Sequence, residues 1–292
     1  MRFPHLAYGT PRKLPRAKDM PGRVVVLDIA FAANVGGASF ERVTKKLIDE
    51  LGDRLAMWID HHDHELHARY ADDPRFILRT KAQHGACPEM VTPERVEAAG
   101  PVDTICCHVD FDGLCSAAKW ITGGEEPYPG ADDDARAIDT RIGEASERAS
   151  VMDRALRARP RDDALKGIIV RFLVDGATDR GLWDRIKSAS ADLDRMEDEA
   201  RRLAKRYRFV GDVAVVDARE RDGPYDKTLL LLLGQERAPI SVVHDETTVT
   251  AAASFDSGIN LLQILGIQGG MPTRVSVSAK ELPEVLEKLR RR

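Results

Sequence analysis

The sequence predicts an α/β fold, with a parallel-sheet domain and its flanking helices, a helical segment, and a smaller C-terminal α/β domain. Two observations lead to this prediction. Short apolar runs rich in β-branched residues alternate with amphipathic stretches, the pattern of strands joined by right-handed crossovers in a parallel sheet. A length of 292 residues with a 43% apolar fraction is also enough to bury two modest cores.

The regular elements of the first domain follow one another in order. Residues 24–28 form a β-branched run after a Pro-Gly pair and predict a buried strand. Apolar side chains recur at helical spacing over residues 40–51, and residues 55–59 predict a second strand. Residues 88–99 then predict a helix, and residues 102–107 predict a third strand.

The chain divides into four predicted segments. We expect residues 1–22 to form a basic, proline-containing, disordered arm, and residues 23–140 to form the core of the first domain. Residues 141–210 predict a helical segment that completes or bridges the domains, and residues 211–292 predict the C-terminal domain. The elements expected in the last two segments are helices 149–156, 164–174, 179–207, 259–265 and 282–289, and strands 213–216, 240–244, 247–253 and 273–278.

Composition excludes several classes of protein. The 44 Lys and Arg residues against 48 Asp and Glu give a formal charge of −4, so we expect no binding of long duplex nucleic acid by bulk charge. The apolar runs fall far short of a bilayer-spanning length, so no membrane association is expected. The 4 cysteines contain no CxxC pair and predict reduced thiols, and the N-terminus lacks a secretion signal. Together these features predict a cytoplasmic protein.

Each of the first three predicted strands ends in a polar cluster. The clusters are Asp28, then Asp60, His61 and His62, then His108, Asp110 and Asp112. The carboxyl ends of parallel strands meet at one edge of a sheet, where ligands bind. So many carboxylates would repel one another without a cation, and carboxylates with imidazoles but no thiolate favour manganese or magnesium. The number of ligands predicts two ions, a pair suited to phosphoryl displacement.

These motifs resemble those of the DHH phosphoesterase superfamily. The Asp60-His61-His62 triplet after one strand and the sequence 108–113, His-Val-Asp-Phe-Asp-Gly, after another carry the resemblance. Asp28 lies where the family's bridging metal ligand would fall, and Asp139 is similar to a further family aspartate. The turn at Gly269-Gly270-Met271-Pro272 is similar to the family's glycine-rich substrate-binding turn. The resemblance therefore touches most of the chain.

The resemblance implies a set of roles for these residues. One ion would be held by Asp28, His108 and Asp110, and the other by Asp28, His61, Asp112 and Asp139. A hydroxide between the ions would be the nucleophile. His62 would face the substrate, Asp60 would orient its neighbouring histidines, and Gly269, Gly270 and Arg274 would bind the substrate. Manganese is the expected cofactor, with magnesium as the alternative.

Two departures from the family pattern stand out. Asp28 and the Asp-His-His triplet precede the motif at 108–113, so the motif order is circularly permuted. A parallel sheet accommodates this if the strand ends still meet in space. Met271 stands where the family's turn usually has a histidine, and Arg141 follows Asp139-Thr140 where a glycine is common. These changes bear on the choice of substrate.

The sequence thus predicts a metal-dependent phosphoesterase that hydrolyses phosphodiester bonds of small nucleotides or short oligonucleotides. The alternatives are a pyrophosphatase or polyphosphatase with the same metals, and a catalytically silent nucleotide-binding module. Structural interpretations also stay open for three positions. Asp139 lies near Asp132, Asp133 and Asp134 and would fit an acidic solvated face, Gly269-Gly270 an ordinary turn, and Arg274 a solvent-facing strand position. The sequence does not indicate the oligomeric state.

Overall fold

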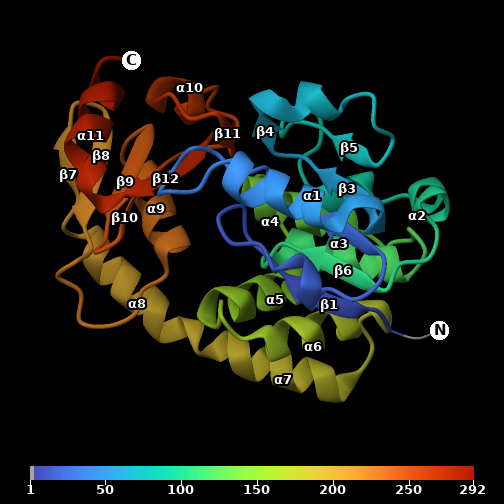
Figure 1. Cartoon of the computed structure of the whole chain (residues 1–292). Helices are drawn as coiled ribbons and strands as arrows, with labels where there is room; N and C mark the ends of the chain where they lie inside the picture. The colour runs from blue at the N-terminus through green and yellow to red at the C-terminus, as the bar shows by residue number, and fades with distance from the viewer. Residues whose placement is uncertain (1–2) are drawn as a thin grey trace.

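Two five-stranded sheets organise the chain in the computed structural model, which describes residues 3–292 (Figure 1). The first sheet has the strand order β1-β6-β2-β3-β5, and every neighbouring pair in it is parallel. The second has the order β12-β10-β9-β8-β7 and mixes parallel and antiparallel pairs. Helices flank both sheets, which confirms the predicted α/β fold class.

The first sheet is covered on both faces. Its strands are β1 (His5–Tyr8), β2 (Val24–Leu27), β3 (Leu55–Asp60), β5 (Phe76–Leu78) and β6 (Thr104–Cys107). Side chains alternate along a strand, so Val25 and Leu27 enter one core while Val24 and Val26 enter the other. All residues of β2, β3 and β6 are therefore buried, as their continuous apolar sequences require.

Different helices fill the two faces of the first sheet. One core contains side chains from α3 (Phe111–Ile121), α4 (Ala131–Thr140), α5 (Glu147–Ala158) and α6 (Asp163–Val174). The other contains side chains from α1 (Lys46–Leu51) and the N-terminal segment. The first helices of the segment predicted at 141–210, α5 and α6, thus pack on the first sheet. The boundaries between the four predicted segments stay predictions.

The N-terminal segment differs from the expected disordered arm. Its residues 1–2 lie outside the described residues, but β1 pairs in parallel with β6 at the sheet edge. Ala17 and Met20 are buried in the core beneath α1, and Arg54 donates hydrogen bonds to the carbonyl oxygens of both. Pro11 and Pro15, with the basic residues from Arg12 to Lys18, lie between these anchored positions.

Two predicted helices differ from the observed elements, and one observed helix lies outside the predicted ones. Residues 88–99 split into a 3₁₀ turn at Cys87–Met90 and helix α2 (Pro93–Ala99), because Pro93 disfavours helix at the residue before it. The long stretch 179–207 forms α7 (Arg180–Ala191) and α8 (Leu193–Ala204), separated at Asp192. The apolar run at 229–233 belongs to helix α9 (Lys227–Gln235), whose first turn is capped by Asp226.

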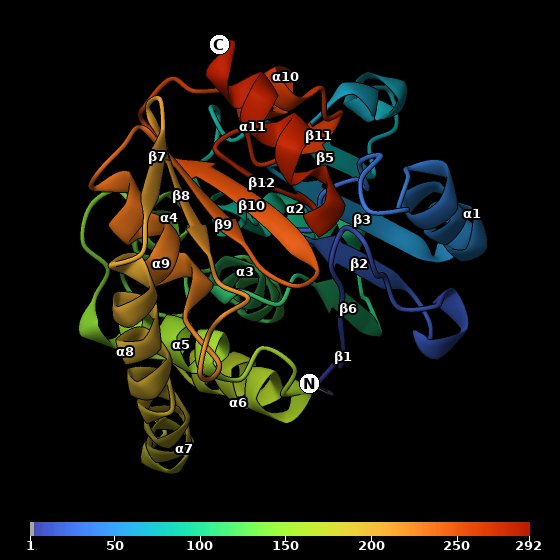
Figure 2. The same cartoon turned by 90° about the vertical axis from the view of Figure 1, so that its left-hand side faces the viewer.

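The second sheet is reached through α8, which runs from the helical layer to that sheet (Figures 1 and 2). Its strands are β7 (Arg208–Val210), β8 (Val213–Asp217), β9 (Ile240–His244), β10 (Thr248–Ala253) and β12 (Arg274–Ser278). Helices α10 (Leu261–Leu265) and α11 (Leu282–Arg290) pack on one face, and α8 and α9 pack on the other.

A short pair of strands joins the two halves of the molecule. Strand β4 (Asp63–His64), just after the Asp-His-His triplet, pairs in antiparallel fashion with β11 (Gly269–Gly270). The backbone N–H of Glu65 also donates to the carbonyl of Gln268 at 3.2 Å. We call this pair the inter-sheet clasp. Within residues 3–292, no helix is both long and apolar enough to span a lipid bilayer.

Candidate metal centre

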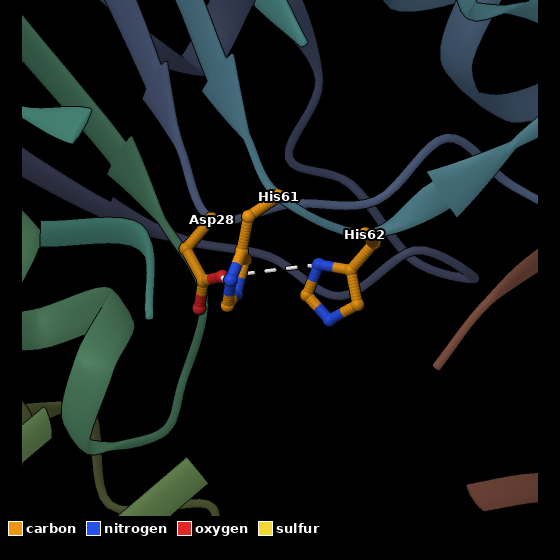
Figure 3. A group of neighbouring side chains, drawn as sticks. All are labelled: Asp28, His61 and His62. Carbon is orange, nitrogen blue, oxygen red and sulfur yellow. Dashed lines mark ion pairs between the residues drawn. The ribbon is translucent and has the colours of Figure 1, made fainter. Parts of the chain in front are cut away.

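The strand order brings the three polar clusters together. Strand β2 lies between β6 and β3, so Asp28 follows the central strand and has one cluster on each side. The permuted order of the motifs along the chain therefore does not separate them in space. Figure 3 shows Asp28 with His61 and His62 at this sheet edge.

Asp28 has an unusual backbone conformation. Its φ angle is 59°, in the left-handed region that non-glycine residues seldom adopt. Its N–H still donates to the carbonyl of Ile59 at 2.8 Å, and the residue is 1% exposed. The strand thus ends in a turn that holds the Asp28 carboxylate inside the sheet edge, a form of local strain typical of functional sites.

Three groups of potential metal ligands meet here: Asp28 with His61 and His62, and two sets that lie on either side of Asp28. In the first set, His108 Nδ1 lies 3.5 Å from Asp28 Oδ2 and 2.7 Å from Asp110 Oδ2. In the second set, His61 Nε2 lies 3.3 Å from Asp112 Oδ2 and 4.0 Å from Asp139 Oδ2. His61 Nε2 is also 3.2 Å from Asp28 Oδ1, so the two oxygens of Asp28 face different sets.

The first set fits a divalent cation. Both oxygens of Asp28 are buried, and among the described residues they face imidazole nitrogens, with no backbone N–H, lysine or arginine donating to them. Burying a carboxylate without a positive charge beside it costs on the order of several kcal/mol of folding free energy. Native proteins therefore pair such a group with a cation or use it to bind a metal ion. Asp28, His108 and Asp110 provide the oxygen and imidazole donors that manganese or magnesium accepts.

Helix α3 begins inside the site and fixes two of its carboxylates. Asp110 precedes the helix and accepts a hydrogen bond from the N–H of Gly113, while Asp112 lies in the first turn and accepts one from the N–H of Cys87 at 3.2 Å. Gly113 is required by close packing, because a Cβ atom there would lie 2.8 Å from the carbonyl oxygen of His108. The Asp-Phe-Asp-Gly sequence thus links strand end and helix start.

The two histidines of the triplet are held by different groups. The Nδ1 atom of His61 lies 2.9 Å from the carbonyl oxygen of His84, which makes Nδ1 the donor and leaves Nε2 as the ring nitrogen that faces the carboxylates. His62 Nδ1 lies 2.8 Å from Asp60 Oδ1. Asp60 thus orients one histidine of the triplet, and a backbone carbonyl that sequence patterns do not reveal orients the other.

The charge state of His62 follows from its surroundings. Burial lowers the pKa of His62 well below its usual value, and the neighbouring Lys81 and His61 lower it further. Burial raises the pKa of Asp60 despite the nearby His61. His62 is therefore a neutral imidazole near pH 7. It lines a cavity of about 380 Å³ between the two sheets, together with His108, Gly269 and Gly270.

Lys81 belongs to this centre, although no sequence pattern points to it. Its side chain is 3% exposed, and its Nζ atom lies 2.9 Å from His61 Nε2 and contacts Asp139 Oδ2. Burial alone would lower the pKa of Lys81, but Asp139 and Asp112 raise it above its usual value. Burial likewise tends to raise the pKa of Asp139, but the contact with Lys81 lowers it. The second set therefore already contains an ammonium group.

Asp139 is not part of a solvated acidic face. It lies in the last turn of α4 and points to Lys81 and His61, with 18% of its side chain exposed. Of the nearby acids, Asp132 pairs with Lys119 and Asp134 accepts a hydrogen bond from Tyr128. The structure thus brings Asp139 to the same sheet edge as the other predicted ligands.

The predicted substrate-binding residues lie across the cleft from these acids. Arg274 is exposed and lines a cavity of about 450 Å³ with Asp110, Asp139, Arg141 and Met271. Arg274 Nη1 lies 3.4 Å from Thr228 Oγ1. The arginine therefore faces the cleft from the second sheet while the carboxylates face it from the first.

Gly269 and Gly270 lie in the inter-sheet clasp. A Cβ atom on Gly269 would lie 2.2 Å from His64 Cδ2 and 2.7 Å from the carbonyl oxygen of Asp63, so only glycine permits this approach. Gly270 has a φ angle of 125°, which also favours glycine. These residues line the smaller cavity, but their glycine identity follows from the close contact with β4.

Comparison with known proteins gives a distant structural likeness. No protein-family model matches the chain, and no curated protein sequence matches it. Among solved structures, the chain is similar to the pGpG-specific phosphodiesterase PggH from Vibrio cholerae, with 13% sequence identity and a TM-score of 0.47. The similarity covers 93% of this chain and 98% of that one.

Proposed function

We propose that the protein is a divalent-metal-dependent phosphoesterase that hydrolyses phosphodiester bonds of small nucleotides or short oligonucleotides. The observation that carries this proposal is the burial of the Asp28 carboxylate at the sheet edge, where no lysine, arginine or backbone N–H among the described residues pairs with either oxygen. Each oxygen faces a different set of imidazole and carboxylate donors. Binding of cations by Asp28 would offset the free-energy cost of burying its charge.

The ligand sets divide between two positions. Asp28, His108 and Asp110 would hold a divalent ion, manganese by preference and magnesium as the alternative. His61, Asp112 and Asp139 form the second position, which would take either another ion or the ammonium of Lys81. A bound divalent ion would polarise a phosphoryl oxygen and lower the pKa of water. The resemblance of the motifs to DHH phosphoesterases supports the same assignment.

His62 is the group best placed to handle a proton in the cleft. It donates its Nδ1 hydrogen to Asp60, so the neutral ring keeps a lone pair on Nε2. That atom is free to accept a hydrogen bond or a proton from water or a substrate hydroxyl. Asp60 fixes the tautomer of the ring, a role that carboxylates commonly have beside functional histidines.

The size and charge of the cleft support a small nucleotide substrate. The cavities of about 450 and 380 Å³ on the two sides of Met271 and Arg274 suit a compact ligand. Within residues 3–292, Arg274 forms no ion pair, and its Nη1 atom lies 3.4 Å from Thr228 Oγ1, so its guanidinium is available to a phosphate. Arg157, in the same cavity wall, is already paired with Asp153 and Asp226. The cleft therefore offers few free cations for a substrate as highly charged as pyrophosphate.

The test is hydrolysis by purified protein with manganese. The substrates would be linear dinucleotides, short single strands, cyclic dinucleotides, mononucleotides and pyrophosphate, with product release followed by chromatography. The Asp28→Ala variant should lose activity, whereas Asp184→Ala, an exposed site on α7, should retain it. Turnover by Asp28→Ala at the wild-type rate would refute the proposed centre.

A further inference from the structure

Lys81 lies among the ligands of the second set rather than on the surface. It follows β5 in the chain, and its backbone N–H donates to Asp63 Oδ2 at 3.2 Å, which fixes the loop beside the clasp. From there the side chain enters the centre, where Nζ lies 2.9 Å from His61 Nε2 and contacts Asp139 Oδ2. A lysine is seldom this buried unless charged partners surround it.

The contacts of Lys81 use the same atoms that a metal ion would need. The Nδ1 hydrogen of His61 is donated to the carbonyl of His84, so Nε2 carries the only ring lone pair that can bind a cation. That lone pair faces the Lys81 ammonium. Asp139 Oδ2 is likewise in contact with Nζ. An ammonium group and a divalent ion cannot both be bound by these two atoms at the same time.

The two ligand sets therefore differ in whether the chain itself supplies a positive charge. At the first set, the buried oxygens of Asp28 face only imidazole nitrogens among the described residues, and His108 faces only carboxylate oxygens. No lysine or arginine within residues 3–292 forms an ion pair with Asp28 or Asp110. At the second set, Lys81 supplies one positive charge against the negative charge of Asp139. One position thus requires a cation from solution, and the other has a cation built into the chain.

We propose that the Lys81 ammonium replaces the second divalent ion, so that the protein binds one ion tightly at Asp28, His108 and Asp110. This inference rests on the proposed metal centre and changes its composition. Lys81 then holds His61 and Asp139 in place and provides the fixed second charge at the sheet edge. A lysine delivers this charge without a dissociation equilibrium, so activity would depend on the occupancy of a single metal site.

The test is a count of bound manganese. Wild-type protein, Lys81→Met and Lys166→Met would be freed of metal, titrated with Mn²⁺ by calorimetry, and examined by electron paramagnetic resonance for a coupled ion pair. Lys166 is the matched control, since it is equally buried but pairs with Asp163 away from the centre. We expect about one tight ion in the wild type and in Lys166→Met, and about two, with a coupled spectrum, in Lys81→Met.

Asp139→Asn provides a second test that does not depend on the folding of Lys81→Met. If Lys81 replaces the second ion, this variant should bind its single tight ion with wild-type affinity. Two tight ions in the wild type, reduced to one by Asp139→Asn, would overturn the inference while leaving the phosphoesterase proposal intact. A single ion in a folded Lys81→Met variant would also overturn it. Binding of no ion by the wild type would instead refute the proposed metal centre itself.

Discussion

The two sheets of this protein share a strand-end pattern but differ in its chemistry. In the first sheet, strands β2 and β3 lead into Asp28 and the Asp-His-His triplet. In the second, the parallel strands β8 and β9 end in Asp217 and His244, with Asp245 following. Both sheets thus bring carboxylates and an imidazole together beyond parallel strands.

The difference lies in whether these carboxylates are already satisfied. The side chain of Arg219 bonds to Asp217 and lowers its pKa to about 2. Burial works against ionisation of Asp245, but Lys227 and the N–H groups of Thr247 and Thr248 lower its pKa. Asp112, in the first turn of α3 at the edge of the first sheet, has its pKa raised by burial and by Asp139. An acid at a strand end therefore indicates a binding site only when its own fold leaves it uncompensated.

We expect the largest difference between the two sheets when one aspartate at each is changed to asparagine and turnover and stability are compared. Asp28→Asn should reduce turnover by at least about a hundredfold, because it removes the carboxylate shared by both ligand sets. It should also raise the melting temperature of the metal-free protein, since it removes a buried carboxylate that no described lysine, arginine or backbone N–H pairs with. Asp245→Asn should do the reverse and lower stability by about 1–3 kcal/mol without loss of turnover.

The measurements are turnover with manganese and thermal unfolding in the presence of a chelator. Equal destabilisation by Asp28→Asn and Asp245→Asn would mean that the Asp28 carboxylate is compensated by the fold. In that case the two sheets would not differ in this respect, and the proposed metal centre would be refuted.

Loosening the inter-sheet clasp should reduce activity less than Asp28→Asn does, and it should leave metal binding unchanged. Gly269→Ala would place a Cβ atom 2.2 Å from His64 Cδ2, so β4 and β11 have to separate. We expect kcat/KM to fall about tenfold through misplacement of Arg274 and the second sheet, while manganese stoichiometry stays unchanged. Gly223→Ala is the control, since a Cβ atom there has open space. A wild-type kcat/KM for Gly269→Ala would show that the clasp does not position the substrate side of the cleft.

The Asp60 to His62 pair should affect turnover without affecting metal binding. Asp60→Asn keeps the size of the side chain but leaves the tautomer of His62 less firmly fixed. We expect kcat to fall by about 10-fold to 100-fold and KM to change little. Steady-state kinetics beside a manganese titration measures both properties. Loss of the bound ion in Asp60→Asn would assign this residue to the metal ligands instead.

The polar strand ends could be predicted because their signals are local. An apolar run followed by Asp or His is visible in the sequence around Asp28, Asp60 and His108, and parallel topology then brings the ends together. Short strand β1 escaped prediction because four residues between prolines carry too little pattern. The break before Pro93 was a local signal that the helical spacing of its neighbours obscured.

The residues that escaped prediction at the site depend on long-range approach. Lys81 is a single lysine in a loop, and only the folded chain shows that its ammonium reaches Asp139. The contact of His61 with His84 uses a backbone carbonyl, which every residue has. The reason for glycine at position 269 is its contact with His64, far away in the sequence. Such constraints belong to the tertiary structure and leave no periodic pattern.

The pH dependence of stability provides the mildest test of the contrast between the sheets. Asp245 has a folded pKa below its usual value of 3.8, so its contribution is present above that value and is lost as the pH falls through the folded pKa. The stability difference between wild type and Asp245→Asn should therefore be constant from about pH 5 to 7 and shrink below about pH 4. Denaturant unfolding across this range measures it, with Asp184→Asn as an exposed control. A difference that persisted undiminished at pH 2 would show that the ionised carboxylate does not stabilise this strand end, and that the two sheets do not differ in the way their pKa values indicate.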